Sequence, residues 1–121
     1  MINLIVLACL LAVIQLWIIP AIFNLNNVKW MTSNRDTDPA VTATYKRAVR
    51  AWKNLQETLP IFLTLAILGV VTNTDLEFAM QLWIAFRVAH LVMYMTSLNI
   101  LRTLSWVGSL TSLGMMGLAL I

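Results

Sequence analysis

Charged and polar residues recur at helical spacing inside otherwise apolar stretches of this sequence, and they have the greatest chemical capability. The first set consists of Arg47, Arg50, Asn54 and Glu57, at successive intervals of 3, 4 and 3 residues. At about 100° per residue, a helix places these four side chains on one face about 80° wide. Guanidinium groups bind carboxylates and a carboxylate binds an ammonium group, so this face suits a ligand that carries both kinds of charge.

A second set of polar residues, Arg87, His90 and Tyr94, has intervals of 3 and 4 residues, with Trp83 one turn earlier. They too form a stripe on one helix face. Arg87 lies near the middle of an apolar stretch, where an arginine costs about 2.5–3.5 kcal/mol even on the lenient insertion scale. We therefore expect Arg87 to face the interior of a helix bundle and to have a partner there.

Glu57 is the partner that the sequence offers to Arg87. Counted from the turn that joins their helices, the two residues lie at similar depths, roughly 21 and 17 Å at 1.5 Å per residue. Glu57 is also the only acidic residue in the apolar part of its helix. We predict that Glu57 and Arg87 form an ion pair or share one ligand.

Together the two stripes predict a polar cavity that is mostly cationic, with one carboxylate and with amide and phenol donors. Such a cavity suits a small anion with several carboxylates and one ammonium group. An alternative is that Lys46, Arg47 and Lys53 extend to lipid headgroups as membrane anchors, and that His90 has only a structural role. One histidine cannot supply two haem ligands, and no Cys/His spacing resembles a zinc site, so we expect no metal.

The composition indicates the elements that position these residues. The chain has 121 residues, of which 60% are hydrophobic and 11% charged, and its mean hydropathy is +0.84. Soluble domains carry about 25% charged residues, so this chain has too little charge to cover a surface in water. Six of its eight Lys and Arg residues are concentrated in one stretch, which disfavours a soluble nucleic-acid-binding protein. The class is an integral membrane protein.

Apolar runs of about 20 residues predict an all-α bundle of four transmembrane helices in one domain, residues 1–121. The expected spans are about 2–23, 44–71, 76–95 and 101–121, with a polar loop over 24–39. Asp36, Thr37 or Asp38 can cap the second helix, with Pro39 in its first turn, and Pro60 is a site for a kink.

The basic residues predict the orientation. Six of them lie in the first loop and the start of the second helix: Lys29, Arg35, Lys46, Arg47, Arg50 and Lys53. Arg102 borders the third loop, whereas the second loop region has Asp75 and Glu77 and no basic residue. The positive-inside rule then places the first and third loops in the cytoplasm and both termini on the other side. Without an organelle signal, we expect a bacterial inner membrane.

Two segments of the sequence resemble those of a known family. Residues 50–60, RAWKNLQETLP, and residues 86–94, FRVAHLVMY, followed by Leu101-Arg102-Thr103, resemble the helix signatures of the MAPEG family, membrane-associated proteins in eicosanoid and glutathione metabolism. Chain length, spans and loop lengths agree as well, so the resemblance covers nearly the whole chain.

The resemblance implies a homotrimer that binds glutathione between neighbouring subunits. In it, the charged ends of glutathione are held by Arg50, Lys53, Asn54 and Glu57, whose helix face Arg47 shares. The site is completed by Arg87, His90 and Tyr94. Arg102 corresponds to the arginine that stabilises the glutathione thiolate, with Thr103 where some members have a serine.

The implied chemistry is glutathione transfer to lipophilic electrophiles, or reduction of hydroperoxides. A thiol with a pKa of about 8.5 is mostly protonated at neutral pH, whereas the thiolate is the nucleophile. A guanidinium that lowers the thiol pKa by about 2 units contributes about 2.7 kcal/mol in favour of the charged form. An apolar electrophile can reach the sulfur from the bilayer.

The sequence also departs from the family pattern. Lys53 replaces an arginine of several members, and Asn24, Asn26 and Asn27 lie where some animal members place an arginine on glutathione. The interval from Tyr94 to Arg102 is one residue shorter than in some members. Leukotriene or prostaglandin specificity is therefore not expected.

Two other functions stay open from the sequence. One is a non-catalytic MAPEG-like protein that binds lipid or glutathione. The other is a small four-helix transporter, which the absence of an acidic residue from the first helix disfavours, as do the arginines near Glu57, which would repel cationic drugs.

Overall fold

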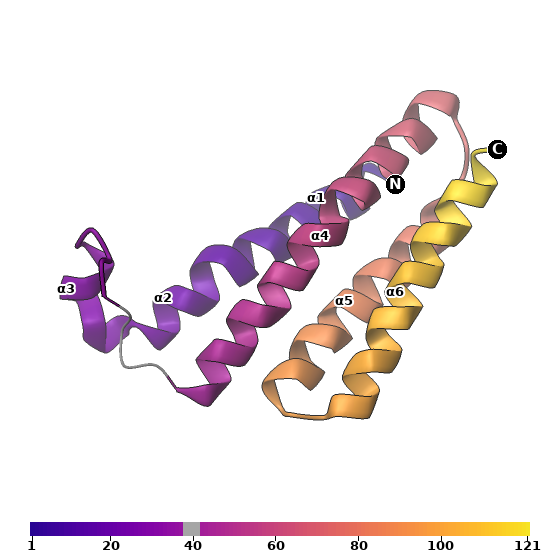
Figure 1. Cartoon of the computed structure of the whole chain (residues 1–121). Helices are drawn as coiled ribbons and strands as arrows, with labels where there is room; N and C mark the ends of the chain where they lie inside the picture. The colour runs from indigo at the N-terminus through magenta and orange to yellow at the C-terminus, as the bar shows by residue number, and fades with distance from the viewer. Residues whose placement is uncertain (38–41) are drawn as a thin grey trace.

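The computed structural model describes residues 1–37 and 42–121, and every regular element in these ranges is a helix. Four long helical stretches lie side by side along one direction, and the short helix α3 (Val28–Met31) lies at one end of the bundle (Figure 1). The N- and C-termini both lie toward the other end of the bundle. The all-helical architecture predicted from the sequence is confirmed.

The first stretch, Ile2–Phe23, is continuous but not uniform. It comprises α1 (Ile2–Val13), a π-helical turn η1 (Ile14–Ile18) and α2 (Ile19–Phe23), and a 3-10 turn η2 (Leu25–Asn27) leads from it to α3. Pro20 accounts for the irregular turn, because proline has no backbone N–H and its ring clashes with the carbonyl four residues earlier. The sequence predicted the helix but not the π-helical turn.

The second long helix, α4 (Ala43–Thr72), begins later than a cap at Asp36, Thr37 or Asp38 would place its start. Thr42 is its N-cap, with the side-chain oxygen accepting a hydrogen bond from the Tyr45 backbone N–H at 3.2 Å. The predicted caps Asp36 and Thr37 are therefore wrong, and Asp38 and Pro39 lie outside the described residues. The helix continues through Pro60 and ends at Asn73, which adopts a left-handed conformation with φ 56°.

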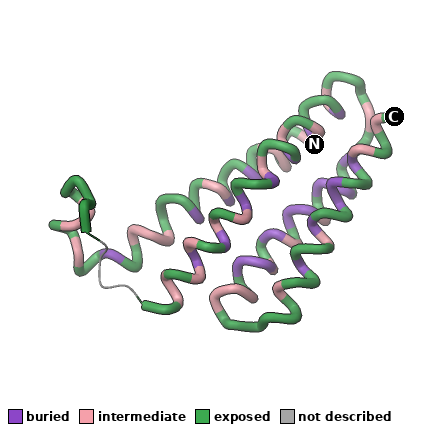
Figure 2. The backbone as a smooth tube through the Cα atoms, viewed as in Figure 1, coloured by how far each residue is buried: buried purple, intermediate pink, exposed green. Residues whose placement is uncertain are grey.

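The last two helices, α5 (Glu77–Met95) and α6 (Asn99–Ala119), form an antiparallel pair (Figure 1). Gly108 permits their close approach, because a Cβ atom there would lie 2.6 Å from Cζ of Phe86. Between α4 and α5, the rings of Phe62 and Trp83 stack with centroids 4.0 Å apart. The buried residues follow these facing sides of the helices, and the outward sides are exposed (Figure 2).

Within residues 1–37 and 42–121, three helices are long and apolar enough to cross a membrane: Ile2–Phe23, Ala43–Thr72 and Glu77–Met95. The helix α6 is present where a fourth span was predicted, but because of its serine and threonine content it is not among the helices that are apolar enough by composition. Ser105 and Ser112 donate hydrogen bonds to carbonyls one turn earlier, at 2.8 and 2.9 Å, which reduces the cost of placing them in an apolar environment. That α6 also crosses the membrane stays a prediction.

Candidate active site

Arg87 is the central buried charge of the bundle. It lies on α5 with only 1% of its surface exposed, as the cost of an arginine in an apolar span required. Its Nη1 donates a hydrogen bond to Oδ1 of Asn54 at 2.6 Å, and its Nη2 donates to the Thr58 hydroxyl. The guanidinium also lies 5.6 Å from the centre of the Trp83 ring. Thus α4 supplies two neutral oxygen acceptors to an inward-facing cation on α5.

Of the two alternatives predicted for Glu57 and Arg87, the ion pair is wrong for a single chain, and the shared ligand stays a prediction. Asn54 lies between the two side chains, because its Nδ2 donates to Oε2 of Glu57 at 3.4 Å while its Oδ1 accepts from Arg87. Glu57 itself is exposed on the outer side of α4. The two charges are therefore coupled through one amide group rather than joined.

Thr58 is a partner of Arg87 that the sequence interpretation missed. It is 6% exposed, and its hydroxyl also donates to the Leu55 carbonyl at 3.4 Å. A recognisable signal was its position four residues after Asn54 and three after the buried Leu55, which places it toward the interior of the bundle.

A cavity of about 250 Å³ opens beside this network, toward the end of the bundle that holds α3. Six residues from α4, α5 and α6 line it: Asn54, His90, Tyr94, Arg102, Thr103 and Trp106. Five of these were predicted site residues, and Trp106 was not. The sequence interpretation passed over Trp106, although an aromatic ring so close in sequence to Arg102 and Thr103 is a signal for a lining residue.

Aromatic side chains position the Arg102 guanidinium at the cavity. Its Cζ lies 4.8 Å from the centre of the Tyr94 ring, which in turn meets the His90 ring edge-on at 5.5 Å. A cation over an aromatic face is attracted by the ring quadrupole, so Tyr94 holds the guanidinium in place. Asn54 connects this cavity to Arg87, and both arginines make the local potential positive.

The remaining predicted residues lie outside the cavity of a single chain. Arg50, Lys53 and Glu57 are exposed on α4, and Arg47 is half-buried. Arg50, Lys53 and Glu57 follow the outward side of the helix, next to the side that carries Asn54 and Thr58. Arg47 lies two turns before Asn54, on the same side of the helix as Asn54. A ligand that contacts both sets must lie against the outer side of α4 as well as in the cavity.

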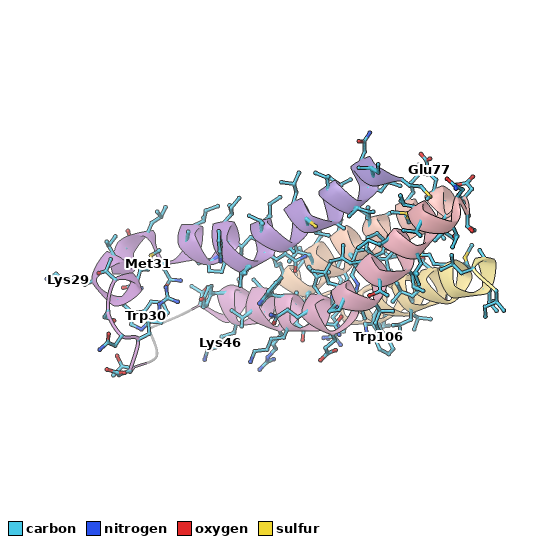
Figure 3. All side chains as sticks on the ribbon, turned by 90° about the horizontal axis from the view of Figure 1, so that it is seen from above. Lys29, Trp30, Met31, Lys46, Glu77 and Trp106 are labelled. Carbon is cyan, nitrogen blue, oxygen red and sulfur yellow. The ribbon has the colours of Figure 1, made fainter. Side chains whose placement is uncertain are left out.

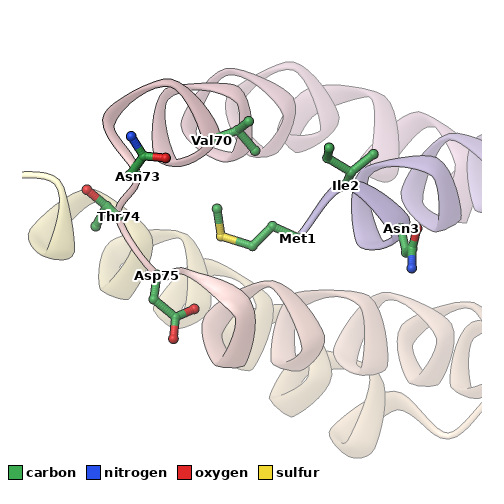
Figure 4. Close-up of a pocket in the computed structure, with 7 residues that line it drawn as sticks. All are labelled: Met1, Ile2, Asn3, Val70, Asn73, Thr74 and Asp75. Carbon is green, nitrogen blue, oxygen red and sulfur yellow. The ribbon is translucent and has the colours of Figure 1, made fainter.

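A second cavity, of about 540 Å³, lies at the opposite end of the bundle near the α4–α5 turn (Figure 4). Met1 and Asp75 are among its lining residues, and none of the predicted site residues belongs to it. The Met1 sulfur accepts a hydrogen bond from the Leu76 backbone N–H at 3.3 Å. The lining of this second cavity includes no arginine or lysine, so the cavity lacks the cationic character expected of the site.

The fold and the site define a helical membrane protein with a buried arginine network and a cationic cavity shared by three helices. Over residues 2–121 the chain matches the model of the MAPEG family. The chain therefore belongs to the MAPEG family, as the sequence segments around Asn54 and Arg87 indicated. No curated protein is similar enough to count as a match.

Proposed function

We propose that this protein is a membrane-bound glutathione transferase, with peroxidase activity toward hydroperoxides. The observation that supports this proposal best is the cavity in which Arg102 is held by Tyr94 beside His90 and Asn54, in a chain of the MAPEG family. The MAPEG family is associated with glutathione, and a fixed guanidinium stabilises the negative charge of a thiolate.

In the proposed reaction, Arg102 stabilises the glutathione thiolate. A lowering of the thiol pKa by about 2 units corresponds to about 2.7 kcal/mol, which is within the range for one adjacent fixed charge. The sulfur then attacks an electrophilic carbon, and the leaving group departs with the bonding electron pair. With a hydroperoxide, the thiolate instead attacks the terminal peroxide oxygen; the O–O bond breaks, and the leaving alkoxide takes up a proton to give the alcohol and glutathione sulfenic acid. The thiol of a second glutathione then attacks the sulfenic sulfur, which gives the disulfide and releases the oxygen as water.

We also propose that a neighbouring subunit completes the site in a homotrimer. The cavity of about 250 Å³ lies below the roughly 300–1,000 Å³ that is usual for a small-molecule site. Arg50, Lys53 and Glu57 are exposed just outside it, as expected for groups that hold the peptide's charged ends against a second chain. Native mass spectrometry of the detergent-solubilised protein should then give three chains per particle.

The proposed orientation places the end with α3 on the cytoplasmic side of a bacterial inner membrane and both termini on the other side. Lys29 and Lys46 are labelled at that end of the molecule, and Glu77 at the other (Figure 3). This charge asymmetry supports the positive-inside orientation. It also places the opening beside Arg102 on the side where glutathione is made available.

The test of the proposed function is thermal stabilisation by glutathione combined with conjugation of chlorodinitrobenzene, both on the protein in detergent. Glu57→Gln should weaken glutathione stabilisation, because it removes the carboxylate proposed to meet the ammonium group. Glu77→Gln is the matched control at the other end of the bundle and should leave stabilisation unchanged. Stabilisation without conjugation would identify a non-catalytic binding protein. The absence of both stabilisation and conjugation would remove the glutathione assignment.

A further inference from the structure

A cavity distinct from the candidate active site lies where α2, α3 and the start of α4 meet. Its volume is about 420 Å³, and its lining includes Trp17, Asn24, Trp30, Arg35 and Tyr45. Trp30 and Met31 are labelled at this end of the molecule, near Lys46 (Figure 3). None of the residues proposed to hold glutathione lines this cavity.

Asn24 lines this cavity and carries a buried side-chain acceptor that has no partner among the described residues. The side chain is 2% exposed, and its Nδ2 donates to the Pro20 carbonyl at 2.8 Å. Because a carbonyl only accepts, this bond fixes the orientation of the amide and directs Oδ1 away from Pro20. Oδ1 is buried and has no hydrogen-bond partner among the described residues. A buried acceptor without a partner is destabilising, so the cavity suits a ligand that brings an N–H or O–H donor.

Arg35 supplies a positive charge at the edge of the same cavity. Its guanidinium lies 5.3 Å from the centre of the Trp30 ring, and its Nη2 donates to the Met31 carbonyl at 3.4 Å. The Trp30 ring is itself fixed, since its Nε1 donates to the Thr37 carbonyl at 2.6 Å. Arginine binds phosphate oxygens with charge-assisted hydrogen bonds, so an anionic phosphate fits this position.

The third feature of the cavity is its continuity with the surface of the first helical stretch. Trp17 and Leu16 line it, and 67% and 39% of their surfaces are exposed on a helix apolar enough to cross a membrane. Tryptophan and tyrosine are enriched at the level of lipid headgroups, where one end of the ring is apolar and the other polar. A ligand here meets polar groups at one end and the hydrocarbon region at the other.

We propose that this cavity binds the headgroup of a glycerophospholipid that carries a hydrogen-bond donor. The phosphate lies at Arg35, a headgroup hydroxyl or ammonium group donates to Oδ1 of Asn24, and an acyl chain follows Leu16 and Trp17 into the membrane. A soluble phosphate compound satisfies the two polar contacts but makes no use of the apolar side.

The experiment is a native mass spectrometry titration of the intact protein in detergent with three lipids. Phosphatidylglycerol and phosphatidylethanolamine carry a donor, whereas phosphatidylcholine has the phosphate without one. We expect the first two to bind about five- to tenfold more tightly than phosphatidylcholine, the effect of one additional hydrogen bond. Asn24→Leu should abolish this preference, and Asn26→Leu, an exposed neighbour outside the cavity, should retain it.

The phosphate contact is tested separately. Arg35→Gln should weaken the binding of all three lipids to a similar extent, and Lys29→Gln, also exposed but outside the cavity, should not. Because Arg35 is exposed on the loop, this arm remains decisive if Asn24→Leu fails to fold. Glutathione stabilisation should be unchanged in both cavity variants, so this proposal and the proposed function fail independently.

Three results would overturn the proposal. The first is equal binding of the three lipids to the unsubstituted protein, and the second is a donor preference that survives Asn24→Leu. The third is competition by glycerol 3-phosphate as effective as that of phosphatidylglycerol, which would assign the cavity to a soluble phosphate compound instead of a membrane lipid.

Discussion

Replacing Thr58 by valine tests the acceptor role of the Thr58 hydroxyl toward Arg87. Valine keeps the shape of the side chain and removes the oxygen to which Nη2 donates. Thr58 and Arg87 are 6% and 1% exposed, so water does not readily replace the lost acceptor. A hydrogen bond to a charged group contributes about 1.5–3 kcal/mol, which is about tenfold to a hundredfold in the unfolding equilibrium. The measurement is the free energy of unfolding in mixed micelles titrated with denaturing detergent.

Thr64→Val is the matched control on the same helix. The Thr64 hydroxyl is exposed and donates to the Pro60 carbonyl at 2.8 Å, so its loss should change stability by no more than about 0.5 kcal/mol. In an Arg87→Met background, Thr58→Val should cost at least about 1 kcal/mol less than in the unsubstituted protein, because the group that it leaves unpaired is gone. Equal costs for the two threonine substitutions, or additive effects with Arg87→Met, would refute the reasoning.

Two further predictions concern backbone geometry and are measured by the same unfolding titration. Gly108→Ala should cost about 1–3 kcal/mol, because the added Cβ would lie 2.6 Å from Phe86 Cζ, whereas Gly114→Ala meets nothing within 4 Å and should stabilise α6 by up to about 1 kcal/mol. The reverse order would contradict the packing of α5 against α6. Asn73→Ala should cost about 1 kcal/mol because Asn73 has φ 56°, and Asn73→Gly should not. Equal effects of the two Asn73 variants would remove the role of the left-handed conformation.

Much of the fold was predictable because apolar runs show where the helices form, and helical spacing shows which of their sides face one another. The inward position of Arg87 followed from the cost of a charge in an apolar span. The start of α4 did not follow, because several residues between Asp36 and Thr42 have capping side chains. Only the tertiary path of the loop decides among them, and Thr42 is the cap.

The pairing of Arg87 was mispredicted because depth along a helix says nothing about rotation around it. Glu57 lies at a depth similar to that of Arg87, but at about 100° per residue it points about 160° away from the buried Leu55. Thr58 points only about 60° away from Leu55, and it is Thr58 that contacts the guanidinium. A search for opposite charges favoured Glu57 and passed over neutral oxygens, although a buried guanidinium needs acceptors more than it needs a formal charge.

The residues on the outer side of α4 show a different limit. Arg50, Lys53 and Glu57 were assigned to the site by resemblance, and in one chain they are exposed and apart from the cavity around Arg102. Neither sequence spacing nor the fold of one chain fixes what covers this side of the helix. The proposed homotrimer supplies that surface.

The most direct test of the account is the ultraviolet difference absorbance of the thiolate when glutathione is added to the protein in detergent at neutral pH. The unsubstituted protein should give a thiolate signal that S-methylglutathione does not give. Arg102→Ala should lose that signal while glutathione still stabilises the protein against heat, because the guanidinium acts on the sulfur and the peptide's charged ends are held elsewhere. An undiminished thiolate signal in Arg102→Ala would contradict the account.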